Sequence, residues 1–319
     1  MFSELPKLLD KNFALGYFLP GTIYLISTVY LLDKFNLLPN LINQLQQDLL
    51  IGTTTIGLIS WLIGVFLLGA NRSIFRLLEG YGEYNPARLL LGFEKWKFNR
   101  INEELSLLDN EYIKFQENGK AFPPELRVKR NRLMQKLVER YPDAPEWILP
   151  TSFGNTIRAF EVYPRVVYGI EAIQGWNRLL GVIPKDFREL IDNAKSQVDF
   201  WVNLGFLSFI FLVQYLGLCI FSGSLESIGL SILALILAIL ASTRAESSAV
   251  QWGELVKSSF DVFLPKLKKE LELNTLPENE RKMWTQFSQV IIYRLPSANQ
   301  KNNSSKESKN KAASPKNKV

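Results

Sequence analysis

The most polar constellation of side chains in this sequence lies between residues 155 and 168. It combines an amide, three charged groups and two phenols: Asn155, Arg158, Glu161, Tyr163, Arg165 and Tyr168. Carboxylates and phenols can act as general acids and bases, so a membrane-surface enzyme could use such a cluster. The spacing of Arg158 and Glu161 also suits an ion pair on one helix face, which is the more common role. We therefore regard these six residues as a candidate functional cluster and assign no active site.

The rest of the usual catalytic repertoire is missing from the sequence. There is no histidine, which excludes His-based acid–base chemistry, Ser-His and Cys-His pairs, and nearly all zinc and haem sites. The one cysteine, Cys219, lies in an apolar run that favours an inert thiol. No P-loop, GxSxG sequence or dinucleotide-binding fingerprint is present. The sequence predicts no catalytic residue, metal ligand or cofactor, and an enzyme is the less favoured interpretation.

Two further polar residues, Asn203 and Gln214, interrupt an apolar stretch. They are eleven residues apart, close to three helical turns, so a helix would carry both on one face. They are candidate pore-lining residues if the protein is an oligomeric channel or transport component. Hydrogen bonds between packed helices are the favoured alternative, because polar side chains in membrane helices commonly serve this purpose.

Four segments of the chain contain no charged residue and are strongly apolar. They are residues 12–32, 49–71, 200–225 and 227–243. About 20 residues of helix cross a bilayer core, so the first three are long enough and the fourth is at the lower limit. The sequence predicts an all-α integral membrane protein with four transmembrane helices and a helical cytosolic insert between the second and third. Pro20 is expected to kink or loosen the first helix.

The distribution of basic residues near the ends of these segments predicts the orientation. Only Lys34 lies on one side. The other side carries ten: Lys7, Lys11, Arg72, Arg76, Arg88, Lys185, Arg188, Lys195, Arg244 and Lys257. We expect a multi-pass protein of the bacterial inner (plasma) membrane with both termini and the insert in the cytosol. Loops 33–48 and 222–226 then face outward.

The pattern divides the chain into five regions. Residues 1–71 hold an N-terminal interfacial segment and the first two spans, and residues 72–199 form the cytosolic helical domain. Residues 200–243 form a transmembrane hairpin, and residues 244–295 form cytosolic amphipathic helices. Residues 296–319 are a basic tail that is expected to be disordered. Within the insert, an acidic arm and a basic arm over about 99–141 predict an antiparallel, coiled-coil-like hairpin. A continuous helix is predicted from Lys185 to Phe221.

Shorter helices are expected in the rest of the insert. Thr151-Ser152 can cap a helix that stops near Tyr163-Pro164, and a second helix is expected at about 168–180. Tyr163, Tyr168 and Trp176 suit either a membrane surface or a small protein core, and the sequence leaves both open. After the fourth span, 245–273 is predicted as a helix whose apolar stripe docks on the insert or on the membrane.

The net charge of +6 is concentrated in the tail. Residues 296–319 hold six lysines against one acid, Glu307, which gives +5. Such a tail could attract anionic lipid, and a merely solvated segment is the alternative. Nucleic acid is an unlikely partner, because the acidic arm of the hairpin would mask the basic one.

Three stretches carry a resemblance to known sequences. They read PTSFGNTIRAFEVYPRVVYGIE at 150–171, GELVKSSFD at 253–261 and LPENERKMW at 276–284. They are similar to a group of uncharacterised bacterial four-span membrane proteins. The resemblance implies a bacterial inner-membrane home, and it implies no activity or site residues because the function of that group is unknown.

Three functions are compatible with these patterns. The favoured one is a membrane-anchored scaffold or regulatory protein that presents the cytosolic helical domain to an unknown cytosolic protein. The first alternative is an oligomeric pore or transport component, and the second is a membrane-surface enzyme. Small residues at Ser60/Gly64 and Ala234/Ala238/Ser242 suit close helix packing within one subunit or in a homo-oligomer.

Overall fold

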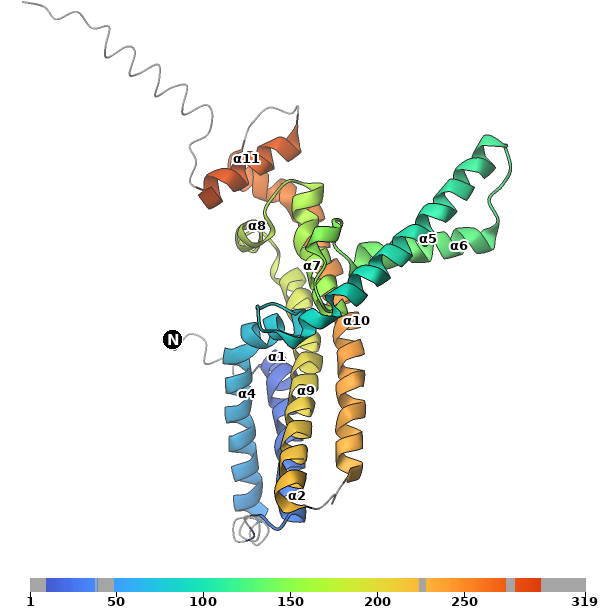
Figure 1. The fold of residues 1–319 in the computed structure, drawn as a ribbon. Helices are drawn as coiled ribbons and strands as arrows, with labels where there is room; N and C mark the ends of the chain where they lie inside the picture. Colours follow the sequence, from blue (N-terminus) through green and yellow to red (C-terminus); the bar gives the residue numbers. More distant parts are fainter. Residues whose placement is uncertain (1–9, 38, 40–48, 224–227, 274–278, 294–319) are drawn as a thin grey trace, which may run out of the picture. The chain divides into compact units, whose positions relative to one another are not determined.

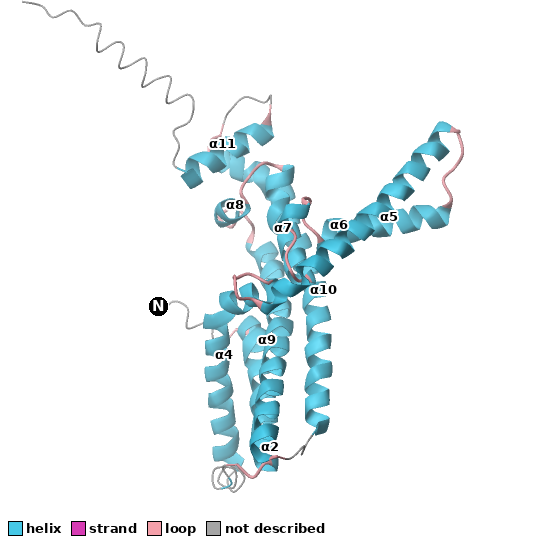
Figure 2. Cartoon of the chain, in the orientation of Figure 1, coloured by secondary structure: helices cyan, strands magenta, loops and turns pink. Residues whose placement is uncertain are grey.

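The computed structural model describes residues 10–37, 39, 49–223, 228–273 and 279–293, and these form helices joined by short turns (Figures 1 and 2). No strand occurs among them. The chain forms two compact units. Unit 1 combines Met1–Phe160 with Lys185–Val256, and unit 2 combines Glu161–Pro184 with Lys257–Val319. Lys7, most of loop 33–48, residues 224–226 and 276–278, and the basic tail lie outside the described residues.

Four helices are long and apolar enough to cross a membrane: Lys11–Lys34, Leu50–Glu79, Lys185–Ser222 and Ile228–Glu270. Each covers most or all of one of the four predicted segments. Large apolar side chains on these helices are exposed, among them Phe66 at 70% and Ile220 at 85%. A water-soluble protein rarely exposes apolar surface on this scale, whereas a bilayer would cover it. The structure therefore supports the prediction of an all-α protein with several membrane-spanning helices.

The first of these helices changes its winding just before Pro20. It begins as α1 (Lys11–Phe13), continues as the π-helical turn η2 (Ala14–Phe18) and becomes α2 (Leu19–Lys34). Proline has no backbone N–H and crowds the preceding turn, so a local π-turn is a common way to keep the helix going. The expected loosening at Pro20 thus takes the form of a π-turn.

Unit 1 contains α2, α4 (Leu49–Glu79), α9 (Lys185–Ser222) and the part of α10 (Ile228–Glu270) up to Val256 (Figure 1). The continuous helix predicted from Lys185 is confirmed. The prediction that 245–273 is helical is confirmed as far as Glu270, and this segment continues α10 from Ile228 without a break. No glycine or proline occurs between Leu240 and Trp252, so nothing local ends the helix there.

Two helices of the insert form a hairpin, α5 (Leu91–Glu117) and α6 (Pro124–Arg140), preceded by the 3-10 turn η3 (Pro86–Leu90). The ion pairs Lys129–Glu104 and Arg130–Asp109 connect the two arms. Surface ion pairs contribute at most about 1 kcal/mol each, so the apolar seam carries most of the stability. α5 starts at Leu91 and not near residue 99, since η3 leads directly into it.

Helix α7 (Ser152–Val167) follows the short 3-10 turn η4 (Pro145–Trp147) and contains Pro164. The predicted stop near Tyr163-Pro164 is therefore wrong. The helix ends at Val167, two residues before Gly169, whose positive φ of +79° lies in the left-handed region that favours glycine. The next helix, α8 (Ala172–Leu179), consequently begins four residues later than predicted.

Unit 2 contains the end of α7, α8, the second part of α10 and α11 (Glu280–Tyr293). Phe260, Leu264 and Leu267 of α10 are buried, and Trp176 packs against Phe260 with ring centroids 6.1 Å apart. Lys266 donates to the carbonyl of Val182. The apolar stripe of this segment thus docks on residues of the insert, which was one of the two predicted alternatives.

Candidate functional site

A buried carboxylate, Glu94, is the centre of the densest polar network in unit 1. Its side chain receives hydrogen bonds from four donors. Lys97 Nζ (2.8 Å) and Ser152 Oγ (3.0 Å) donate to Oε1, and Tyr141 Oη and Asn155 Nδ2 (both 3.3 Å) donate to Oε2. The residue is only 4% exposed. Burying a carboxylate is tolerated when it is paired and hydrogen-bonded, and this one has both kinds of partner.

Three elements bring these groups together. Glu94 and Lys97 lie in the first two turns of α5, Tyr141 directly follows α6, and Ser152 and Asn155 begin α7. Asn155 is fully buried and also bonds the backbone of Leu149 through both ends of its amide. It therefore fixes the turn before α7 as well as the carboxylate.

The start of α7 is held tightly against the end of α4. Thr151 Oγ1 accepts the N–H of Gly154, as predicted for a helix cap, and donates to the carbonyl of Leu78. A Cβ on Gly154 would lie 2.4 Å from the carbonyl oxygen of Glu79. Only glycine allows this approach, and the crossing places Ser152 and Asn155 beside Glu94.

The electrostatics keep the neighbouring phenol neutral. Burial raises the pKa of Tyr141 well above its ordinary value, and the charge of Glu94 and the hydrogen bond to it act in the same direction. A phenol in this state donates to the carboxylate and does not act as a base or nucleophile near neutral pH. The arrangement suits binding better than catalysis.

Glu94 and Lys97 line a cavity of about 500 Å³ between α5, α7, α9 and α10. Its polar wall also includes Thr151, Ser152 and Glu246. Its apolar lining comes mainly from the following residues: Leu78, Leu90, Phe93, Phe153, Trp201, Val202, Gly205 and Ala238. This volume is within the range of about 300–1,000 Å³ that is usual for small-molecule sites.

The six residues of the predicted polar cluster are divided between the two units. In unit 1, Asn155 belongs to the Glu94 network, and the guanidinium carbon of Arg158 lies 5.7 Å from the centre of the Tyr81 ring. In unit 2, Arg165 pairs with Glu171 at 3.4 Å. Arg158 and Glu161 both have further interactions.

Tyr163 and Tyr168 in unit 2 share one acceptor. Both hydroxyls donate to Oδ1 of Asp261, at 2.8 and 2.7 Å. Burial and then the hydrogen bond to Asp261 raise the pKa of both phenols, that of Tyr168 to about 12. These contacts tie the last turn of α7 and the residue that follows it to α10.

The two predicted pore residues make hydrogen bonds between α9 and the first candidate span. Asn203 is fully buried and donates to the carbonyl of Gly16 at 2.8 Å. Gln214 donates to Tyr24 Oη at 2.6 Å and accepts from Thr28 at 3.5 Å. This is the packing role given above as the favoured alternative.

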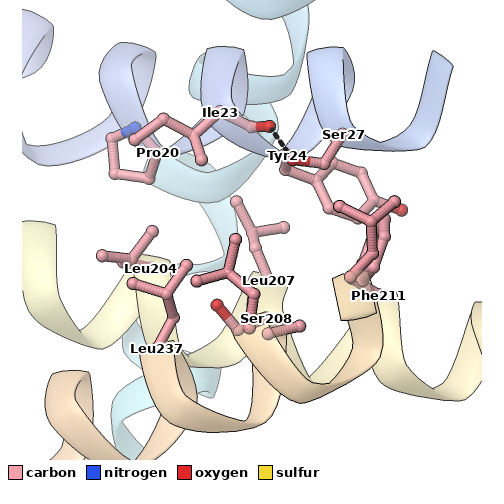
Figure 3. Close-up of a pocket in the computed structure, with 12 residues that line it drawn as sticks. Pro20, Ile23, Tyr24, Ser27, Leu204, Leu207, Ser208, Phe211 and Leu237 are labelled. Carbon is pink, nitrogen blue, oxygen red and sulfur yellow. Dashed lines mark hydrogen bonds between the residues drawn. The ribbon is translucent and has the colours of Figure 1, made fainter. Parts of the chain in front are cut away.

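One cavity among the described parts of the candidate spans is small and mainly apolar. Figure 3 shows a space of about 40 Å³ between α2, α9 and α10, with Pro20, Leu207 and Leu237 among its lining residues. The hydrogen bond drawn there joins Ser27 to the carbonyl of Ile23 within α2. Neither Asn203 nor Gln214 lines this space.

A second buried carboxylate, Asp199, was not predicted from the sequence. It accepts hydrogen bonds from Lys195 (2.8 Å), from the Tyr17 hydroxyl (2.8 Å) and from Asn71 (3.3 Å). Three of the four candidate spans meet at this network. The i, i+4 spacing of Lys195 and Asp199 was a signal for the pair, but its partners lie far away in the sequence.

Glu94 was likewise missed, although Glu94 and Lys97 have the i, i+3 spacing of a helical ion pair. Among the described residues, no group of three or more acidic or cysteine side chains is arranged to hold a metal ion. Comparison of the chain with protein-family models, curated proteins and solved structures finds no match. A functional proposal must therefore rest on the geometry.

Proposed function

We propose that this protein is a membrane-anchored scaffold or regulatory protein whose α5/α6 hairpin binds a cytosolic partner. The observation that carries the proposal is an exposed face of α6. Val128, Asn131, Met134 and Val138 follow one another at steps of three or four residues, so they share one side of the helix. The three apolar members are 58, 45 and 57% exposed.

The opposite side of α6 forms the seam with α5. Leu133 and Leu137 are partly buried there, and Leu133, Leu137 and the buried Ile101 belong to one apolar cluster. The exposed face is therefore not needed to hold the hairpin together. Regularly spaced apolar residues on a helix are the pattern by which one helix recognises another.

The charges around this face indicate the chemistry of the partner. Arg127, Arg132 and Lys136 are exposed on α6 beside the apolar residues. An amphipathic helix with acidic flanks would complement both the apolar strip and the basic groups. We expect a cytosolic protein with such a helix as the partner.

The orientation predicted from the basic residues supports the same proposal. If the ends rich in lysine and arginine face the cytosol, the hairpin, both termini and unit 2 are cytosolic. The four candidate spans then act as the anchor, in the bacterial inner membrane that the sequence resemblance implies. A pore is less well supported, because Asn203 and Gln214 are engaged in hydrogen bonds between helices.

The proposal is tested by co-purification of the full-length protein from native membranes in a mild detergent. The Met134→Glu/Val138→Glu variant places acidic groups on the exposed face of α6. Ile113→Glu is the matched control, since Ile113 is 50% exposed on the other arm. We expect a reproducible partner with the wild type and with Ile113→Glu that is lost from the double variant. The same set of proteins from all three would refute the proposal, and a second copy of this chain as the partner would replace it with a homo-oligomer.

A further inference from the structure

The cavity beside Glu94 has an apolar half that belongs to the candidate spans. Trp201, Val202 and Gly205 of α9 and Ala238 of α10 lie within the charge-free segments predicted to cross the bilayer. A tryptophan at the end of such a segment is typical of the membrane–water interface. The apolar half of the cavity is therefore at a depth where acyl chains and headgroups meet.

The polar half of the cavity carries charges of both signs. Lys97 supplies an ammonium group, and Glu94 and Glu246 supply carboxylates. Each carboxylate is already matched by a cation, Glu94 by Lys97 and Glu246 by Arg140. The wall is thus close to neutral and offers both donors and acceptors.

From this arrangement we propose that the cavity binds a zwitterionic aminophospholipid, such as phosphatidylethanolamine, from the surrounding bilayer. The phosphate accepts a hydrogen bond from the ammonium group of Lys97, which has three N–H donors and gives one of them to Glu94. The ammonium group lies near Glu94 and Glu246, and the upper part of one acyl chain lies against Val202 and Ala238. A volume of about 500 Å³ holds the headgroup and part of a chain and leaves the rest of the lipid in the bilayer.

The charge of the wall selects the headgroup. A lipid with only a phosphate would bring an uncompensated negative charge into a partly buried wall whose own charges already balance, and burying an unpaired charge is costly. A lipid with both a phosphate and an amine adds no net charge. This inference goes beyond the proposed scaffold function and does not depend on it.

The site lies at the base of the hairpin. Glu94 and Lys97 belong to α5, and Ser152 belongs to α7, so a bound headgroup would contact both helices at the start of the insert. Lipid occupancy would therefore stabilise the first turns of α5.

The test is native mass spectrometry of the full-length protein, delipidated in detergent and then titrated with phosphatidylethanolamine or phosphatidylglycerol. Ala238→Phe fills the apolar half of the cavity. Ile239→Phe is the control, because Ile239 is the next residue of the same helix and is 59% exposed. Lys97→Gln removes the ammonium group, and its melting temperature is measured beside its lipid binding, because Lys97 is the cation paired with the buried Glu94.

We expect phosphatidylethanolamine to bind the wild type and Ile239→Phe alike, and roughly tenfold more weakly to Ala238→Phe and Lys97→Gln. Equal binding to all four proteins would overturn the site. Phosphatidylglycerol that binds as tightly as phosphatidylethanolamine would overturn the choice of headgroup. Free phosphoethanolamine is added last, as a competitor of phosphatidylethanolamine for the wild type. If it competes as well as the intact lipid does, the ligand is a soluble molecule and the lipid assignment fails.

Discussion

The amide of Asn203 donates a hydrogen bond to the backbone carbonyl of Gly16 at 2.8 Å. In an α-helix that carbonyl would accept the N–H of residue 20, and residue 20 is a proline with no N–H to give. A side chain of α9 thus donates to a backbone carbonyl of the π-turn, where Pro20 interrupts the α-helical hydrogen-bond pattern of the first candidate span. Unsatisfied backbone groups are costly in a bilayer, so this bond explains why a polar residue lies within the third span.

The relationship between Asn203 and Pro20 predicts a coupled effect of substitution. Asn203→Leu should destabilise the protein by about 1–3 kcal/mol, because the Gly16 carbonyl then lacks its side-chain donor in an apolar setting. In a Pro20→Ala background residue 20 regains an N–H, so the same substitution should cost less. A double-mutant cycle of unfolding in detergent measures the difference. Equal costs in both backgrounds would mean that the bond does not compensate for the proline.

The close approach at Gly154 predicts a steep cost for the smallest side chain. Gly154→Ala places a Cβ 2.4 Å from a backbone oxygen of Glu79, so α4 and α7 must separate, at about 1–3 kcal/mol. Gly92→Ala in α5 is the matched control, since a Cβ there meets no atom within 4 Å. That change should stabilise α5 by about 0.5–1 kcal/mol. Thermal unfolding measures both, and a neutral Gly154→Ala would contradict the tight crossing.

The shared acceptor of Tyr163 and Tyr168 predicts a loss of stability at alkaline pH. Both phenols have a raised pKa in the folded protein, about 12 for Tyr168 against the ordinary value of 10.0. Between these values the unfolded chain loses protons that the folded chain retains, so stability is full below pH 10.0 and falls as the pH rises to about 12.

The Tyr163→Phe/Tyr168→Phe variant tests this account of the alkaline loss. It cannot ionise at these positions, so its melting temperature should fall less steeply than that of the wild type over this pH range. Tyr141, whose pKa is also raised, remains in both proteins and cancels from the comparison. Parallel curves would show that the two phenols do not titrate differently on unfolding.

The proposed orientation predicts a difference in labelling from the two sides of the membrane. Replacing the free cysteine Cys219 by alanine allows single cysteines to be introduced at exposed Ala121, between α5 and α6, or at exposed Asp33, near the end of α2. In right-side-out cells a membrane-impermeant maleimide should label Asp33→Cys at once. It should label Ala121→Cys only after the membrane is broken. The reverse pattern would place the insert outside.

The sequence was sufficient for the spans and the hairpin arms, because charge-free windows and helical periodicity are local properties. It was misleading at Pro164, where a local signal for a break is overridden. Pro164 lies within α7, whose last turn is held by the bonds of Tyr163 and Tyr168 to Asp261. Arg140, the last residue of α6, forms an ion pair with Glu246 of α10.

The polar networks could not be predicted, because their members are distant in the sequence. The donors to Glu94 from Tyr141, Ser152 and Asn155 lie 47, 58 and 61 residues away. Asn203 and Gly16 are 187 residues apart. Only the nearest pairs, Glu94 with Lys97 and Lys195 with Asp199, leave a local pattern, and helical ion pairs of this kind are too common to indicate a site.

The most direct test of the proposed scaffold function is photocrosslinking in living cells from the exposed face of α6. A photoreactive amino acid at position 134 should give one discrete adduct with an acidic cytosolic protein, and Val138→Glu in the same chain should abolish it. The same photoreactive group at position 113 on α5 is the control and should give no such adduct. Adducts that are the same from both positions, or that survive Val138→Glu, would contradict a partner-binding face on α6.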